Sequence, residues 1–305
     1  WQVKEKLGAA EAYTEFRAEN AFAGGTARLR VYQADPYQPE DVRKAQVNRI
    51  ANAYRALSKL PLHPNIVAAR DFFPTDDDKS FILILDDAPG QALTVHMARP
   101  QLALTLDQKW RVAKDLLAAL AHAHHHGVVH RNLTPGAILI GQDGTTRITD
   151  FDFAKPGVDR SLTIATDIVD LVEKAYVAPE AFREPGAASS ASDVFSAGVI
   201  LYELFTGERP FAGEPTTVWH RAGEFLNKPS ALRPELNEAF DAWLQSLCAF
   251  DEHQRLTASA ALAALYALLQ PVDQAVSQTA EAPKPEVFEV DDAQTDYLNL
   301  TAGHR

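Results

Sequence analysis

Cysteine and methionine are almost absent from this sequence. Cys248 is the only cysteine in 305 residues, which excludes an intrachain disulfide framework and a metal site built on paired cysteines. A chain so poor in cysteine is typical of a reducing setting, so we expect a cytoplasmic protein. Met97 is the only methionine and the first residue is Trp1. We therefore expect the sequence to be a piece of a longer polypeptide.

Long hydrophobic runs and excess positive charge are also lacking. No apolar run reaches the roughly 18 residues of a membrane span, and no basic segment followed by an apolar one opens the chain. The 29 Lys and Arg residues face 41 Asp and Glu residues, a formal net charge of −12. This balance argues against a broad basic face for nucleic acid but leaves room for one small anion site. We expect neither a membrane nor a nucleic acid as partner.

What is present is the pattern of a folded protein with two dissimilar regions. Residues 1–88 predict a small sheet with one helix, and residues 89–270 predict a mainly helical region. The expected elements of the first region are short strands over 1–34 with a turn at Gly24–Gly25, a helix over 40–60, and strands over 65–73 and 80–87. Those of the second are helices over 106–126, 192–206, 216–226, 234–250 and 257–269, with two short strands around a polar turn at 128–140. Residues 271–305 are rich in Pro, Ala and acidic residues, and predict a linker or disordered tail.

Six short motifs follow one another along the chain. They are HPNIV (63–67), HRNLTPGAILI (130–140), ITDFD (148–152), YVAPE (176–180), DVFSAGVILYELFTGERPF (193–211) and DEHQRLTA (251–258). In this order they resemble the signature set of the eukaryotic-like Ser/Thr protein kinase family. The resemblance covers about residues 1–270. It implies an α+β, bilobal fold, with a small β-rich N-lobe carrying one main helix (1–88), a larger and mostly helical C-lobe (89–270), and a cleft between them.

The resemblance also assigns chemical positions in the polar turn, and these depart from the family pattern. The family's H-R-D-x-x-x-x-N turn uses its Asp to accept or orient the proton of the substrate hydroxyl, and its Asn to hold a second Mg²⁺. Asn132 and Ala137 occupy these two positions, and Thr134 replaces the lysine between them. An amide cannot take the proton, and alanine has no oxygen for a metal. We therefore expect no catalytic residue in this turn.

The N-lobe positions depart as well. The family's V-A-I-K strand places a small residue over the adenine and a lysine on the phosphates, and Arg28 and Arg30 occupy these positions. Strand alternation sends both to one face, where Arg28 would compete with the purine for space. Arg30 could still contact a phosphate, although a planar guanidinium does not replace an ammonium group.

Three further family features are missing. Ala53 and Tyr54 lie where the glutamate partner of the strand lysine is expected. The Gly-rich phosphate loop keeps only Gly8, and Val172-Glu173 replaces the Gly-Thr pair before the YVAPE motif.

The positions that match the family mostly build its fold. His130 and Phe151 match its hydrophobic spine, and Asp193 matches the carboxylate that anchors the catalytic loop. Glu180 and Arg255 match a buried ion pair of the lower lobe. The departing positions are mostly chemical, and this division is the pattern of a pseudokinase.

Asp150 is the one chemical residue that matches. It stands in the position that binds the phosphate-bridging Mg²⁺, so Arg30 and Asp150 are the candidate nucleotide contacts and Asp150 the candidate metal ligand. Asp152 follows where glycine is usual. It either supplies a second metal oxygen or repels Asp150 and raises a carboxylate pKa. The sequence leaves this choice open.

Three functions fit these residues. The first is a catalytically impaired kinase-like domain that serves as a regulatory or protein-binding module, acting on a protein partner or on a neighbouring domain of the same polypeptide. It requires no cofactor, although ATP and Mg²⁺ binding stays open. The second is a divergent, active Ser/Thr protein kinase that transfers phosphate from Mg-ATP. The third is a scaffold that is insensitive to nucleotides because Arg28 fills the adenine position.

Overall fold

The computed structural model describes residues 1–9, 13–33, 37, 39–75, 80–151, 155–156, 174–211, 218 and 221–270. Its first compact unit runs from Trp1 to Leu269. The predicted tail at 271–305 lies outside the described residues, as do Asp152, Val172 and Glu173. The predictions made for them, and the lobe boundary after residue 88, stay predictions.

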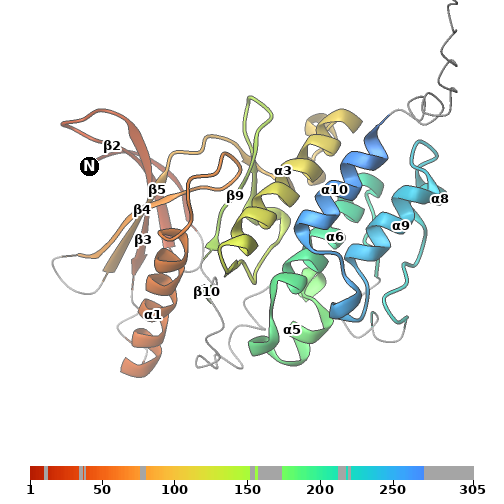
Figure 1. Cartoon of the computed structure of the whole chain (residues 1–305). Coiled ribbons are helices and arrows are strands. Elements are labelled where there is room, and N and C mark those ends of the chain that lie inside the picture. Colours follow the sequence, from red (N-terminus) through yellow and green to blue (C-terminus); the bar gives the residue numbers. More distant parts are fainter. Residues whose placement is uncertain are drawn as a thin grey trace, which may run out of the picture. The chain divides into compact units, whose positions relative to one another are not determined.

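A five-stranded antiparallel sheet forms the N-terminal lobe (Figure 1). The strands are β1 (Gln2–Ala9), β2 (Tyr13–Glu19), β3 (Thr26–Gln33), β4 (Ala69–Pro74) and β5 (Ser80–Asp86), in the order β1-β2-β3-β5-β4. The β2–β3 hairpin turns at Gly24 and Gly25, whose φ angles of 68° and 86° are left-handed. Glycine adopts that conformation without steric cost, which is why the pair predicted the turn.

The two faces of this sheet pack against different neighbours. On one face Ala18, Ala27, Leu29 and Ile84 form a small cluster. On the other, β-strand side chains pack with Ile50 of α1 (Glu40–Leu57), the helix predicted over 40–60. The members of this second cluster are Tyr32, Ile50, Val67, Leu83, Leu85 and Ala88. Since Arg28 and Arg30 pair with Leu85 and Leu83 across β3 and β5, both arginines lie on the α1 face.

The second lobe is mainly helical. Its long helices are α3 (Leu106–His125), α6 (Ser190–Thr206), α9 (Glu238–Leu247) and α10 (Ala258–Leu269), and they share one hydrophobic core (Figure 1). The first two begin with capping boxes, in which Thr105 pairs with Gln108 and Ser189 with Ser192. The architecture is thus α+β with two lobes, as the sequence predicted.

Short elements complete the second lobe. The short α-helices are α2 (Leu93–Ala98), α5 (Pro179–Arg183) and α8 (Pro229–Leu232), and 3₁₀ turns cover Pro100–Leu102, Pro135–Ala137, Lys174–Tyr176, Pro185–Ala187 and Glu252–Gln254. The short strands are β6 (Gln91–Ala92), β7 (Val128–Val129), β8 (Ile138–Ile140), β9 (Thr146–Ile148) and β10 (Lys155–Pro156). They form a β6-β8-β9 sheet and a β10-β7 pair.

Two helix predictions need correction. The helix expected over 234–250 begins only at Glu238, because the Asn237 side chain accepts a hydrogen bond from the Phe240 N–H and caps it there. In the segment expected to be helical over 216–226, Val218 is helical, whereas residues 221–223 form a turn and residues 224–226 are not helical. Ala222 and Gly223 there have left-handed φ angles of 49° and 80°, which no α-helix accommodates.

None of the helices in the described part of the chain combines the length and the apolar character needed to cross a membrane.

Candidate functional site

The polar turn at 130–137 lies between β7 and β8, as predicted, and Asp193 of α6 holds its backbone. Asp193 Oδ2 accepts a hydrogen bond from the His130 N–H at 2.8 Å, and Oδ1 accepts one from the Arg131 N–H at 2.8 Å. His124 of α3, whose role the sequence did not indicate, donates from Nε2 to Oδ2 at 2.9 Å. Burial would raise the pKa of Asp193, but the hydrogen bond and charge of His124 and the His130 N–H outweigh it and hold that pKa below its usual range. The turn is therefore anchored on a buried carboxylate.

His130 is a buried core histidine. Its Nε2 donates to the Thr149 carbonyl at 2.8 Å, and its Nδ1 accepts from the Asn132 N–H at 3.3 Å. Both ring nitrogens are thus engaged in the neutral form, with the proton on Nε2 as these two partners require. The ring packs against Phe151 with centroids 4.6 Å apart. His130 and Phe151 therefore form the predicted hydrophobic contact, and His130 has no free nitrogen for proton transfer.

The rest of the turn has the shape of a catalytic loop without a catalytic carboxylate. Asn132 is half-buried, and Ala137 is buried. None of residues 130–137 is acidic. Arg131 has a left-handed φ of 69°, a conformation that Asp193 stabilises through the Arg131 N–H. The turn is thus ordered by its anchor but contains no group that accepts a proton from a hydroxyl at neutral pH.

Arg30 links the sheet to the segment that follows β9. Its Nε donates to Glu15 Oε1 of β2 at 3.1 Å, and its Nη2 donates to Thr149 Oγ1 at 3.2 Å. Nη2 also lies 2.5 Å from Asp150 Oδ1, and the guanidinium stacks on the Tyr13 ring at 4.6 Å. Arg30 is only 3% exposed. The structure thus brings the two candidate nucleotide contacts, Arg30 and Asp150, together as an ion pair.

Arg28 bonds to the link between the two lobes. Its Nη2 donates to the carbonyl of Ala88, which lies between β5 of the large sheet and β6 of the small one. Its guanidinium also faces Glu15 Oε2 and Asp87 Oδ1, each at 3.7 Å. The side chain is 11% exposed. Arg28 therefore spans the sheet face on which the resemblance places a small residue and an adenine.

Glu15 and Asp87 are the residues that sequence reasoning missed. The family resemblance places the partner of the strand residue in the helix, at Ala53 and Tyr54; Ala53 is buried and Tyr54 packs against the cluster of the α1 face. The partner of Arg30 comes instead from the β2–β3 hairpin. The turn of this hairpin is centred between residues 22 and 23, which places Glu15 opposite Arg30. Residues directly opposite in an antiparallel pair share a face and interact. The carboxylate thus comes from β2 and not from the helix.

Asp150 has the backbone of a constrained residue and a side chain that is already paired. Its φ is 60°, and its side chain is 27% exposed. Next to it Arg30 brings a permanent positive charge, and Ala137 offers no second ligand. Among the described residues, no group of three or more His, Cys, Asp or Glu side chains could hold a metal ion. The described arrangement therefore does not fit Mg-ATP. Arg28 occupies the position where the adenine would lie, and the positive charge of Arg30 is paired with the carboxylate that would bind the metal.

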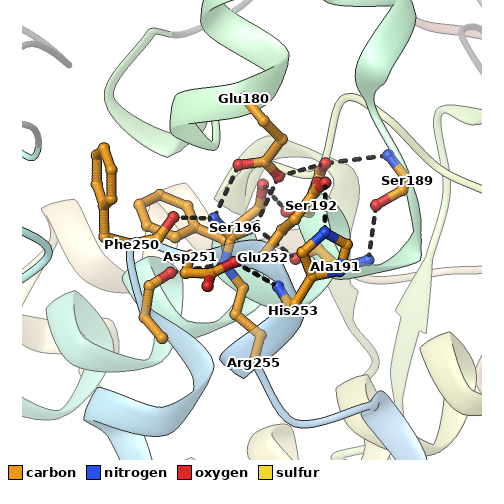
Figure 2. Close-up of polar contacts among 12 residues, drawn as sticks. Glu180, Ser189, Ala191, Ser192, Ser196, Phe250, Asp251, Glu252, His253 and Arg255 are labelled. Atoms are coloured by element: carbon orange, nitrogen blue, oxygen red, sulfur yellow. Dashed lines mark hydrogen bonds and ion pairs between the residues drawn. The ribbon is translucent and has the colours of Figure 1, made fainter.

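The predicted ion pair of Glu180 and Arg255 forms the core of a second polar network (Figure 2). Arg255 Nη1 and Nη2 donate to Glu180 Oε1 and Oε2 at 2.6 and 2.8 Å, a bidentate pair. Ser192 Oγ donates to the same Oε1 at 2.7 Å. Burial would raise the pKa of Glu180, but Arg255 and Ser192 outweigh it and hold that pKa below its usual range. This network joins α5, α6 and the segment before α10.

Comparison with known proteins agrees with this geometry. A family model described as the protein kinase domain matches residues 36–267. The chain is 27% identical over 260 residues to a probable serine/threonine-protein kinase, PknB, of Lactococcus lactis, covering 84% of the chain and 40% of that protein. It is 30% identical over 284 residues to the DNA damage-responsive serine/threonine-protein kinase RqkA of Deinococcus radiodurans, covering 88% of the chain and 39% of that protein. The chain thus spans about two fifths of the length of these relatives.

Proposed function

The chain belongs to the protein kinase family, and on that premise we propose that it is a catalytically impaired member that works as a regulatory or protein-binding module. Its partner would be another protein or a neighbouring domain of the same polypeptide. The near absence of cysteine supports a cytoplasmic setting for this module.

One observation carries the proposal. The turn at 130–137 is anchored by Asp193 in the manner of a working catalytic loop, but the residue at the proton-accepting position is Asn132. Loss of a positioned general base typically costs about 10²–10⁴-fold in rate. Ala137 removes a metal ligand as well, and such losses act as a unit. What the loop retains is its fold, which suits a surface for a partner.

The two lobes supply a means of regulation. A partner that binds one lobe arrangement better than another shifts the population toward it, by no more than its difference in affinity. The hydrogen bond of Arg30 to Thr149 and its ion pair with Asp150 lie where such arrangements would differ. A kinase-like fold can therefore transmit a binding event without transferring phosphate.

The test is phosphate transfer from radiolabelled Mg-ATP, to the domain itself and to a generic protein substrate. We expect the wild-type domain to give no more signal than its Asp150→Asn variant, with an active Ser/Thr kinase domain as positive control. A wild-type signal that exceeds the variant's would contradict the proposal.

A second candidate, a divergent active Ser/Thr protein kinase, is favoured by one observation. Asp150 is held in a defined left-handed conformation and Phe151 packs on His130, so this part of the site is assembled. In that case Asp150 and Asp152 would hold the metal and Arg30 would contact a phosphate. The same assay separates the candidates, because this one requires transfer that disappears in Asp150→Asn.

A further inference from the structure

We infer that Arg28 and Arg30 close the nucleotide site from within, and that the contacts of Arg30 with Thr149 and Asp150 hold the two lobes together in place of a bound nucleotide. The inference rests on the proposed function, because it concerns the same site and states how that site is regulated. It follows from the observation that the described arrangement of Arg28, Arg30 and Asp150 does not fit Mg-ATP.

Arg28 carries the first step. Its bond to the Ala88 carbonyl joins β3 to the link between the lobes, 60 residues further along the chain. A planar base inserted between these two groups would break this bond. It would also displace the Arg28 guanidinium, only 11% exposed, from its carboxylate partners Glu15 and Asp87. The Arg28 side chain thus opposes a nucleotide sterically and electrostatically.

Arg30 carries the second step. Glu15 of the large sheet holds one side of its guanidinium, and Thr149 and Asp150, directly after β9, hold the other. Backbone hydrogen bonds already join β9 to the segment before β4, between Ile148 and residues Asn65 and Val67. Arg30 adds a side-chain link at the point where nucleotide and metal would otherwise connect the lobes.

The arginines of this network are paired without a ligand. Among the described residues, four carboxylates lie within 3.7 Å of the guanidinium groups of Arg17, Arg28 and Arg30. The carboxylates are Glu5, Glu15, Asp87 and Asp150. A site built to receive a polyphosphate and Mg²⁺ needs unneutralised groups of each sign. This one is neutralised from within the chain.

The first experiment measures the melting temperature of the domain with and without millimolar ATP, in the presence of Mg²⁺ or of EDTA. We expect the wild type to shift by less than about 1 °C. The double variant Arg28→Ala/Arg30→Lys restores a small residue and an ammonium group. A tenfold excess of ligand over Kd raises the melting temperature of a domain of this size by about 3–6 °C, and we expect a shift of that order, dependent on Mg²⁺, in the double variant.

Arg70→Ala is the matched control. Arg70 lies in β4, at the edge of the same sheet and separated from β3 by β5, and pairs with a carboxylate, Asp86, but its side chain is 47% exposed. It should leave the ATP response at the wild-type value. If the double variant does not fold, the single variant Arg28→Ala replaces it, because the Arg30 ion pairs are then kept.

A second measurement tests the link between the lobes. The Thr149 N–H donates to the Ala137 carbonyl at 2.9 Å, so its hydrogen exchange reports opening of the segment that Arg30 holds. We expect exchange roughly tenfold faster in Arg30→Met than in wild type or Arg70→Ala. Unchanged exchange would remove the lobe-joining part of the inference.

Failure of the inference differs from failure of the proposed function. A wild-type domain that binds ATP but transfers no phosphate overturns the closed site and leaves the impaired kinase intact. A folded double variant that gains no ATP response also overturns the inference, because closure then has another cause. Transfer by the wild type overturns the proposed function itself.

Discussion

The chain contains two ion-pair networks, and they are built differently. Around Arg255, whose side chain is fully buried, all three guanidinium nitrogens donate to oxygens of Glu180 or of the backbone at 2.6–3.2 Å. Around Arg28 the pairs are 3.7 Å long and partly exposed. Among the described residues Arg28 Nε and Asp87 Oδ1 have no hydrogen-bond partner. The first network is fully hydrogen-bonded, whereas in the second the carboxylate pairs of Arg28 are loose and only the Arg30 contacts, at 2.5–3.2 Å, are tight.

This difference indicates that one network stabilises the fold and that the other controls the arrangement of the lobes. A fully hydrogen-bonded, buried pair has a single low-energy geometry, and breaking it leaves an uncompensated charge. The longer pairs of Arg28 with Glu15 and Asp87 can exchange partners at smaller cost. Stability therefore depends on the network of Glu180 and Arg255, and the lobe arrangement depends on that of Arg28 and Arg30.

The largest expected effect is on the buried pair. Arg255→Met removes the partner of Glu180 and should lower the free energy of unfolding by about 3–5 kcal/mol. Urea denaturation followed by circular dichroism measures it. Arg183→Met, an exposed arginine of the same α5 segment as Glu180, should stay within about 0.5 kcal/mol of wild type. Equal losses in the two variants would show that the pair is not the source of stability.

A smaller loss is expected at the anchor of the turn. Asp193→Asn keeps the size of the side chain but replaces one acceptor oxygen with an amide, so one of the three donors that Asp193 serves loses its partner. We expect a loss of about 2–3 kcal/mol, as for hydrogen bonds to a charged group. Hydrogen exchange at the His130 and Arg131 amides should rise in parallel. Slow exchange there in a destabilised variant would argue that the turn has another anchor.

The third-largest effect is expected from acid, which should weaken the network of Glu180 and Arg255. The folded-state pKa of Glu180 is depressed, so its stabilising contribution is present above the unfolded-state pKa, about 4.3, and is lost as the pH falls through the folded-state value. The melting temperature of the wild type should therefore fall between pH 6 and pH 3 more steeply than that of Glu180→Gln. Parallel curves for the two proteins would show that another carboxyl causes the acid loss.

The smallest effect is expected at the network of Arg28 and Arg30. Asp150→Asn should cost about 1 kcal/mol or less, because Asp150 is 27% exposed and Arg30 keeps its bonds to Glu15 and Thr149. The loss should shrink further in 1 M salt, whereas that of Arg255→Met should not. A loss as large as that of Arg255→Met would mean that the site is a structural core rather than an adjustable one.

Local signals predicted most of the fold. Hydrophobic periodicity indicated α1, α3, α6 and α10 within a few residues, and the Gly24–Gly25 turn indicated the β2–β3 hairpin. The helix that periodicity predicted over 221–226 is wrong, because hydrophobic periodicity does not show where the backbones of two distant segments come close together. A Cβ atom at Gly223 would lie 2.8 Å from the Phe250 backbone nitrogen, so this position is a turn packed against a distant segment.

Family motifs predicted the structural part of the site. They paired Glu180 with Arg255 and placed Asp193 behind the turn, because residue type and order along the chain suffice to identify such positions. The Gly24–Gly25 pair predicted the hairpin but not its register, so Glu15 was missed as the partner of Arg30, which it faces in the structure. The contacts that were predicted are those implied by a recognised pattern.

The remaining contacts depended on how the two lobes meet. Arg30 reaches Thr149 across 119 residues, and Arg28 reaches Ala88 across 60. The sequence shows that both side chains are long and charged, but not which carboxylate or carbonyl will stand within about 3 Å of them. That is decided only when the β3 face, the link after β5 and the segment after β9 pack together, because Coulombic attraction and hydrogen bonding act at distances that chain order does not encode.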